Sequence, residues 1–240
     1  MVAESQEKFS YDADSLIALE KSISTERLTP YLALANGDRK YAILLYEWNT
    51  KLSEALYSIN QGFEVTLRNA IHERMTMAFG SDRWYDCAPL QEEQAYQVQQ
   101  AKQRIRHDGR EITPGRVVAE LMFGFWTSLA GTAYAQSLWD KHLHLVFREK
   151  RVGRKIVAKR LQKIRLLRNR VAHHESIIGK VGMERNLQQD VAEIIEATAW
   201  ICRTTAKWIT CNNTFDQHHE NRPVQPSQTL PFDGSEQVSI

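Results

Sequence analysis

Arg168 and His173 are the side chains best suited to chemistry on this chain, and they lie within the segment Arg168-Asn169-Arg170-Val171-Ala172-His173-His174. A planar, permanently charged guanidinium can bind a phosphodiester, and an imidazole can take a proton from a ribose hydroxyl at neutral pH. On a helix, Asn169 and His173 share one face, whereas Arg168 lies about 100° round from Asn169. One helix therefore brings the arginine and the histidine together poorly. Pairing two copies across a two-fold axis would place two of each around one cleft.

The doubled histidine leaves two candidates for a general base. We favour His173, because it shares a helical face with Asn169, which could orient one of the reacting side chains. His174 shares a face with Arg170 and could instead hold a structural partner such as Glu175 or a backbone carbonyl. Adjacent histidines on a helix point apart, and no cysteine or acidic residue completes a tetrahedral set around any histidine pair. The sequence therefore predicts no metal site and no cofactor.

A second cluster of polar residues falls on one side of a predicted long helix and comprises Glu64, Arg68, Asn69 and His72. Glu64 and Arg68 are four residues apart, as are Arg68 and His72, which is the spacing of helical salt bridges. The Arg68 to His72 spacing is one residue shorter than that between Arg168 and His173. We interpret the cluster as support that orients Arg168 or His173, rather than as a second active site.

Eleven lysines and arginines lie between Arg148 and Arg170, against the single acid Glu149, although the whole chain has a formal net charge of only +2. Lysines and arginines normally occupy a solvated face, so the run has an ordinary structural interpretation. Its density nevertheless favours contact with a phosphate backbone, whose binding would weaken steeply with salt. The residues that we expect to bind RNA are Arg151, Arg154, Lys155, Lys159, Arg160, Lys163 and Arg165.

The elements that must position these residues are helices. From about Asp38 to Phe79, apolar residues recur mostly at steps of three and four, which predicts one long helix with a buried stripe. Gly62 inside this pattern predicts a close helix contact or a bend, because glycine costs roughly 1 kcal/mol relative to alanine in a helix. No segment has the convincing alternating pattern of a strand. The predicted fold class is therefore all-α.

Other segments predict shorter helices. Thr113 and Pro114 form a helix cap followed by proline at the first turn, and Trp84-Tyr85 should anchor the loop that follows the long helix. Aromatic residues in the helical stripes are expected in the core rather than as platforms for stacked bases, and these are Phe63, Phe125 and Trp208. Further helical segments are expected from about Asp14, around Thr29-Pro30, and over 92–106, 134–147, 154–174 and 187–211. The first two of these look peripheral.

Residues 1–212 are predicted to form a single helical domain, and residues 213–240 a disordered tail, because the composition shifts there to Asn, Gln, Pro, Ser and acids. Cys87, Cys202 and Cys211 show no paired or metal-ligand spacing, which favours a reducing compartment. The N-terminus lacks the apolar core of a signal peptide, and no apolar run is long enough for a membrane span. We therefore expect a cytoplasmic protein with no membrane contact.

The segment Arg168-Asn169-Arg170-Val171-Ala172-His173 resembles the signature of HEPN ribonucleases, in which an arginine and a polar residue precede a histidine by a few positions. The wider sequence resembles the Abi-like, or abortive infection, branch of that superfamily in four blocks that occur in the same order. These blocks are Leu45-Tyr46-Glu47-Trp48-Asn49, Glu64-Val65-Thr66-Leu67-Arg68-Asn69-Ala70-Ile71, Phe123-Gly124-Phe125-Trp126 and Leu167-Arg168-Asn169-Arg170-Val171-Ala172-His173-His174-Glu175. They lie within roughly residues 31–208, and four ordered blocks are more specific than the short signature alone.

The resemblance implies a HEPN-like helical bundle with additional peripheral helices, which forms a homodimer with a composite nuclease site. In that site His173 would be the general base toward the 2′ hydroxyl, Arg168 would stabilise the phosphate charge, and Asn169 would orient one of them. The products would be a 2′,3′-cyclic phosphate and a 5′ hydroxyl. The resemblance also implies a role in phage defence as a growth-arresting toxin, which an antitoxin or another regulatory protein could restrain.

Two functions of different classes follow from these residues. The leading hypothesis is a metal-independent endoribonuclease that acts on RNA as a homodimer, with His174, Glu64, Arg68 and Asn69 as alternative or supporting residues. The other is a non-catalytic module of the same fold that binds RNA or a protein, in which Arg168 and His173 serve helix packing.

Overall fold

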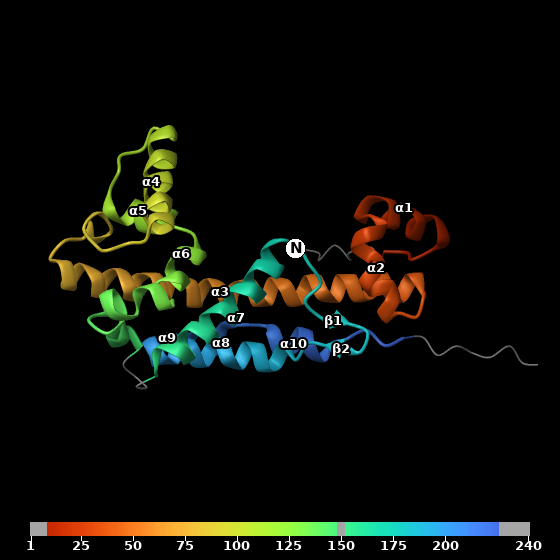
Figure 1. The fold of residues 1–240 in the computed structure, drawn as a ribbon. Coiled ribbons are helices and arrows are strands. Elements are labelled where there is room, and N and C mark those ends of the chain that lie inside the picture. Colours follow the sequence, from red (N-terminus) through yellow and green to blue (C-terminus); the bar gives the residue numbers. More distant parts are fainter. Residues whose placement is uncertain (1–8, 148–151, 226–240) are drawn as a thin grey trace, which may run out of the picture.

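The long helix predicted between Asp38 and Phe79 is confirmed and forms the axis of the molecule. The computed structural model describes residues 9–147 and 152–225. In it α3 spans Arg39–Phe79, begins where the Asp38 side chain accepts a hydrogen bond from the Tyr41 amide, and is followed by Gly80 in the left-handed conformation. Its buried residues recur mostly at steps of three and four, so one face packs and the rest stays accessible. Figure 1 shows α3 running along most of the length of the molecule, with other helices beside it.

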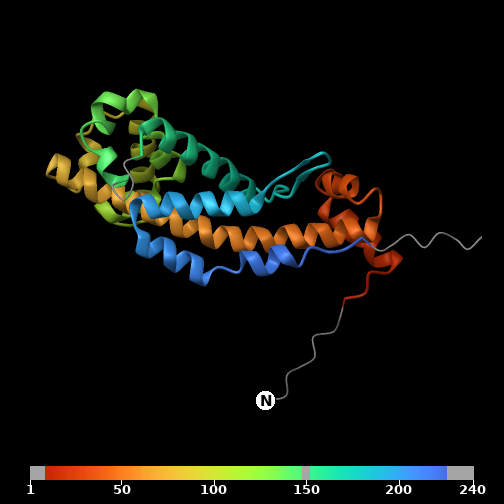
Figure 2. The same cartoon turned by 90° about the horizontal axis from the view of Figure 1, so that it is seen from below.

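Three helices from the second half of the chain pack along α3. α7 (Arg154–Ala172) and α8 (Leu187–Ile201) lie beside it, and α9 (Arg203–Asn212) runs back along it after the chain turns (Figure 2). A minimal antiparallel hairpin of β1 (Gly179–Lys180) and β2 (Met183–Glu184) joins α7 to α8. The all-α prediction therefore holds for the described chain, apart from these two-residue strands.

Two small helices pack at the N-terminal end of α3 (Figure 1). α1 (Ala13–Ile23) and α2 (Thr25–Leu34) contact each other and α3. Leu28 and Tyr31 of α2 are almost completely buried, so this helix belongs to the core and is not peripheral as expected. Pro30 lies inside α2, which starts at Thr25, several residues before the segment expected around Thr29-Pro30.

The C-terminal half of α3 carries an aromatic cluster and the helices that surround it. Trp84 is fully buried against Phe125 and Trp126, which confirms the predicted anchor of this loop. Thr113 accepts a hydrogen bond from a backbone amide of the first turn and caps the following helix, as predicted. The elements at this end are η1 (Trp84–Asp86), α4 (Glu92–His107), α5 (Pro114–Glu120) and α6 (Phe123–Ser128).

Two predicted helices are interrupted. The segment expected over 134–147 contains only short 3₁₀ and π turns, which are η2 (Thr132–Tyr134), η3 (Ala135–Trp139) and η4 (Leu143–Phe147). The helix expected over 187–211 breaks at Cys202, whose backbone is extended with φ −150° and ψ 109°. This break separates α8 from α9 and changes which residues of α9 face the core.

Residues 213–225 do not form the disordered tail that their composition predicted. They include α10 (Phe215–Glu220), which packs on α3 with the Phe215 side chain fully buried. The Trp48 indole of α3 also donates a 2.7 Å hydrogen bond to the His218 carbonyl. One buried aromatic residue and such backbone hydrogen bonds hold the polar segment in place. The remainder of the predicted tail lies outside the described residues.

Gly62 marks the closest approach of α9 to α3. A Cβ built on Gly62 would lie 2.7 Å from Cδ1 and 2.9 Å from Cγ1 of Ile209, which is itself buried. Of the two expectations for this glycine, a close helix contact or a bend, the close contact is confirmed. The missing side chain allows α9 to lie against α3, and α9 forms one wall of a surface groove.

We expect Gly62→Ala to lower the free energy of unfolding by about 1–2 kcal/mol, because overpacking against Ile209 outweighs the roughly 1 kcal/mol that alanine gains in helix propensity. Chemical denaturation monitored by circular dichroism measures this change. Gly115→Ala is the matched control: no atom lies within 4 Å of its built Cβ, so its stability should be unchanged or slightly raised. An equally stable Gly62→Ala protein would contradict the close contact.

Candidate functional site

Arg168 lies on α7 and reaches across to the accessible side of α3. Its Nε is 3.4 Å from Oε2 of Glu64, and the two side chains are 38% and 20% exposed. At this distance and exposure the contact is a partly solvated ion pair, not a bidentate one, so it orients the guanidinium without neutralising it completely. The structure thus brings together Arg168 and the glutamate of the second polar cluster.

A cavity of about 210 Å³ opens beside this ion pair. Its charged lining residues are Glu64, Arg68 and Arg168, so two guanidinium groups face one carboxylate and the net charge is positive. Two polar atoms at the cavity walls are buried without a hydrogen-bond partner among the described residues, namely Arg68 Nε and Asn60 Oδ1. Buried donors and acceptors normally find partners, so this cavity has the chemistry to bind a polar, anionic group. The complete lining is Tyr57, Asn60, Gln61, Glu64, Val65, Arg68 and Arg168.

His173 and His174 lie at the C-terminal end of α7, and both are exposed. The His173 amide donates a 2.9 Å hydrogen bond to the Asn169 carbonyl, which keeps these two residues one turn apart although the regular helix ends at Ala172. His174 adopts a left-handed backbone with φ 56°, a conformation common just after helices. Its carbonyl accepts a hydrogen bond from Arg27, so this residue holds the chain turn through its backbone. Among the described residues that line the arginine cavity, none is a histidine.

The remaining members of the second polar cluster point elsewhere. Asn69 is exposed and lines a separate, larger groove. His72 accepts a 3.0 Å hydrogen bond at Nδ1 from the Trp84 indole and so braces the aromatic cluster. Only Glu64 and Arg68 of this cluster therefore reach the surroundings of Arg168.

Two basic residues of α7 pair with acidic residues of α8. Arg160 pairs with Glu193 and Glu196, and Lys163 pairs with Asp190 and Glu193, so both bind α8. Lysine and arginine side chains that are tied in this way contribute to helix packing more than to a free positive surface.

The other basic residues are less uniform. Arg154 donates a 3.1 Å hydrogen bond to the Ala130 carbonyl, and Arg165 lies beside α6 with its Nε buried and without a partner among the described residues. Lys155 and Lys159 are exposed. Arg151 lies outside the described residues. Among the described residues, the predicted RNA-contacting set therefore does not form one continuous cationic stripe, and Lys155 and Lys159 are its exposed members.

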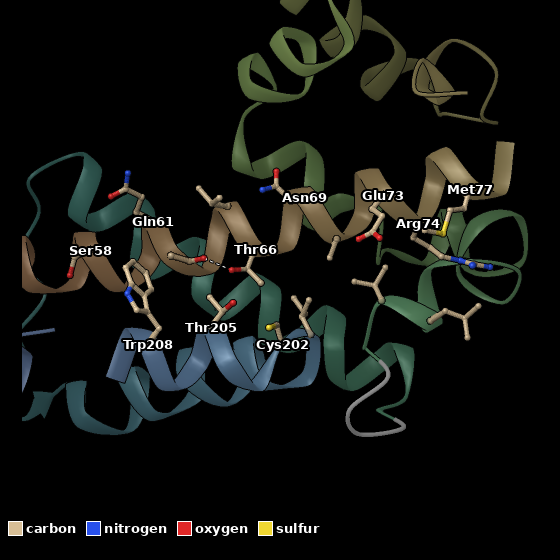
Figure 3. Close-up of a pocket in the computed structure, with 16 residues that line it drawn as sticks. Ser58, Gln61, Thr66, Asn69, Glu73, Arg74, Met77, Cys202, Thr205 and Trp208 are labelled. Atoms are coloured by element: carbon tan, nitrogen blue, oxygen red, sulfur yellow. Dashed lines mark hydrogen bonds between the residues drawn. The ribbon is translucent and has the colours of Figure 1, made fainter. Parts of the chain in front are cut away.

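A groove of about 850 Å³ lies on α3 next to the arginine cavity (Figure 3). Gln61 and Val65 line both hollows, which makes them neighbours on the same surface. Trp208 stands at one end of the groove and is 60% exposed, so the prediction that it belongs to the core is wrong. Phe63 and Phe125 are fully buried, as predicted. The break at Cys202 turns Trp208 outward and places Ile209 in the core instead.

Comparison with protein-family models, with curated proteins and with solved structures gave no match for this chain. Within residues 9–147 and 152–225, no three histidine, cysteine or acidic side chains gather closely enough to hold a metal ion. The helices in the same ranges lack the combination of length and apolar character needed to cross a bilayer.

We expect the stability of the protein to fall as the pH drops from about 7.5 to about 5.5, in part through His72. Burial lowers the pKa of His72 below its ordinary value of 6.5, although the nearby Asp82 carboxylate opposes this shift. The unfolded chain therefore binds the proton more readily, so the stabilisation is complete above the ordinary pKa and is lost as pH falls below it. Protonation at Nδ1 would also remove the hydrogen bond from Trp84.

Thermal midpoints measured across this pH range test the effect. His72→Gln should show a smaller decrease than the wild type, because glutamine can accept the indole hydrogen bond without binding a proton. His107→Gln is the control, since His107 lies exposed on α4, and it should retain the full decrease. The assignment fails if His72→Gln and the wild type lose stability equally.

Proposed function

We propose that this chain is a metal-independent endoribonuclease whose active site forms where two copies meet. The observation that carries the proposal is the accessible cavity in which Arg68 of α3 and Arg168 of α7 face a single carboxylate, while the exposed His173 follows the last residue of α7. Within one copy, the cavity contains two guanidinium groups but no imidazole, because His173 lies outside it. A two-fold arrangement that places His173 of one copy at the arginine cavity of the other would bring an imidazole and the guanidinium groups together in each site.

In this site the phosphodiester binds to the guanidinium groups of Arg68 and Arg168. His173 takes the proton from the ribose 2′ hydroxyl, whose oxygen then attacks the adjacent phosphorus. The bond from phosphorus to the 5′ oxygen breaks, and that oxygen leaves with a proton from solvent or from a protonated imidazole. The arginines stabilise the negative charge that develops on the phosphoryl oxygens, and the products are a 2′,3′-cyclic phosphate and a 5′ hydroxyl.

The resemblance to Abi-like HEPN ribonucleases supports the same proposal. Its signature coincides with the residues at the cavity and at the end of α7, and the block that begins at Glu64 provides Arg168 with its ion-pair partner. By this likeness the biological role is a growth-arresting toxin or phage-defence effector in the cytoplasm, held in check by an antitoxin or regulatory protein.

A non-catalytic RNA- or protein-binding module is the alternative. The Glu64–Arg168 ion pair favours it, because the same contact can serve helix packing alone. The position of His173 outside the arginine cavity of its own copy points the same way.

We expect Arg168→Ala and His173→Ala each to reduce RNA cleavage by about 10²–10⁴-fold while circular dichroism and thermal midpoint stay nearly unchanged. The Arg168 side chain is 38% exposed and His173 is also exposed, so their loss should not unfold the protein. His107→Ala, also an exposed histidine, is the matched control and should cleave like the wild type. Cleavage should persist in excess chelator. If either active-site variant cleaves normally, or if activity requires an added divalent ion, the proposed mechanism is wrong.

A mixed dimer tests whether the site is shared between copies. When the Arg168→Ala and His173→Ala chains are coexpressed with different tags, half of the dimers contain one of each. Each mixed dimer keeps one site with both groups intact, so activity should return to about a quarter of the wild-type level. Dimers purified through both tags should have about half of the wild-type activity. If these mixed dimers remain inactive, the two groups act within one copy and the shared site is contradicted.

A further inference from the structure

The groove beside the arginine cavity has a lining suited to a neutral, flat and partly polar ligand. Apolar side chains form much of it, including Val65 and Ile201, while amides and hydroxyls provide hydrogen-bonding groups. Its charged side chains, Glu73 and Arg74, have opposite signs and lie away from Trp208, toward the other end of the groove (Figure 3). The groove therefore lacks the excess positive charge that a phosphate would need, whereas the neighbouring cavity has it.

Trp208 presents a large aromatic surface to this groove. Its side chain is 60% exposed, and its Cζ3 lies 4.0 Å from the position that a Cβ on Gly62 would occupy. Figure 3 shows the indole directed from α9 toward α3 at one end of the groove, with Gln61 on the other edge of α3 and Asn69 further along that helix. An exposed tryptophan offers a stacking face to any nucleobase, and an amide can both donate to and accept from the edge of a base.

The two hollows are joined through shared residues. Gln61 and Val65 line the groove and the arginine cavity alike, so a ligand can occupy both at once. A nucleotide has this divided chemistry, with an anionic phosphate next to a flat, neutral base. Single-stranded RNA places its bases within reach of a protein, whereas a duplex keeps them stacked and paired.

We infer that the groove between α3 and α9 binds an unpaired base next to the scissile phosphate, with Trp208 as the stacking surface and Asn69 contacting the edge of the base. This inference rests on the proposed function, because it takes the arginine cavity to hold the phosphate. It makes the substrate single-stranded RNA and moves Asn69 from a supporting catalytic role to base recognition. The volume of the groove, about 850 Å³, is larger than one base requires, so the groove can hold a base.

Equilibrium binding of a labelled single-stranded oligonucleotide with 2′-O-methyl riboses tests the inference, because such a strand cannot be cleaved. Trp208→Ala should weaken binding about ten-fold, and Trp208→Phe, which keeps an aromatic face, should weaken it about three-fold or less. Tyr96→Ala is the matched control, since Tyr96 is comparably exposed on the distant α4 and should bind like the wild type. Asn69→Ala should change the ranking of oligo-A, oligo-U and oligo-C strands. Binding of the same sequence as a duplex should not depend on Trp208.

Strand binding and RNA cleavage are separate measurements, so base binding in the groove can fail or hold independently of nuclease activity. If Trp208→Ala binds the single strand like the wild type, the groove does not hold a base, whether or not ordinary RNA is cleaved. If the wild type binds through Trp208 but cleaves no RNA, the nuclease proposal fails and the groove stands. If Trp208→Ala instead weakens self-association in sedimentation measurements and leaves strand binding intact, the groove seats a second copy and the inference is overturned.

Discussion

The apolar stripe of α3 is the constraint on which the candidate site depends. Burying residues from Leu45 to Met75 against the other helices fixes the rotation of this helix about its axis. Two further rows of side chains then remain on the accessible sides of α3, about 100° apart by helical periodicity. The row that contains Tyr57, Glu64 and Arg68 faces the arginine cavity, and the row that contains Asn69 faces the groove.

The same constraint explains why the two hollows are neighbours. Gln61 and Val65 fall between the rows and therefore border both. α7 closes the first hollow with Arg168, and α9 closes the second with Trp208. Gly62 decides how near α9 can come, because its Cβ would collide with Ile209. The rotation of this one helix thus places a cavity that can bind an anion beside a groove that can bind an uncharged group.

The parts of this arrangement that follow local rules could be predicted from the sequence. The α3 stripe and the cap at Thr113 depend on periodicity or on neighbouring residues. The residue types at Trp84 and Gly62 indicated an anchor and a close contact, but not the partners of either. Trp208 could not be placed in this way. It lies seven residues after Ile201, a spacing that keeps one face in an unbroken helix, but the extended backbone at Cys202 resets the phase.

Contacts between residues far apart in the sequence could not be predicted either. Phe215 is one aromatic residue in a polar segment, and its burial against α3 depends on a tertiary contact that composition does not reveal. In the candidate site, the four-residue spacing of Glu64 and Arg68 indicated a shared face, but not that Glu64 would reach Arg168. The basic run likewise did not indicate that Asp190 and Glu193 of α8 would pair with Lys163.

This pairing changes how affinity for RNA must arise. Because Arg160 and Lys163 pair with acids of α8, fewer of the basic side chains described on α7 can contact phosphate than the sequence run suggested. Fewer phosphate contacts release fewer counterions, so binding should weaken with salt less steeply than the sequence run alone suggests. The affinity for RNA that these phosphate contacts do not provide then has to come from interactions that salt does not screen. Stacking on an exposed indole is such an interaction, which is why the outward turn of Trp208 beside the arginine cavity matters to the proposed function.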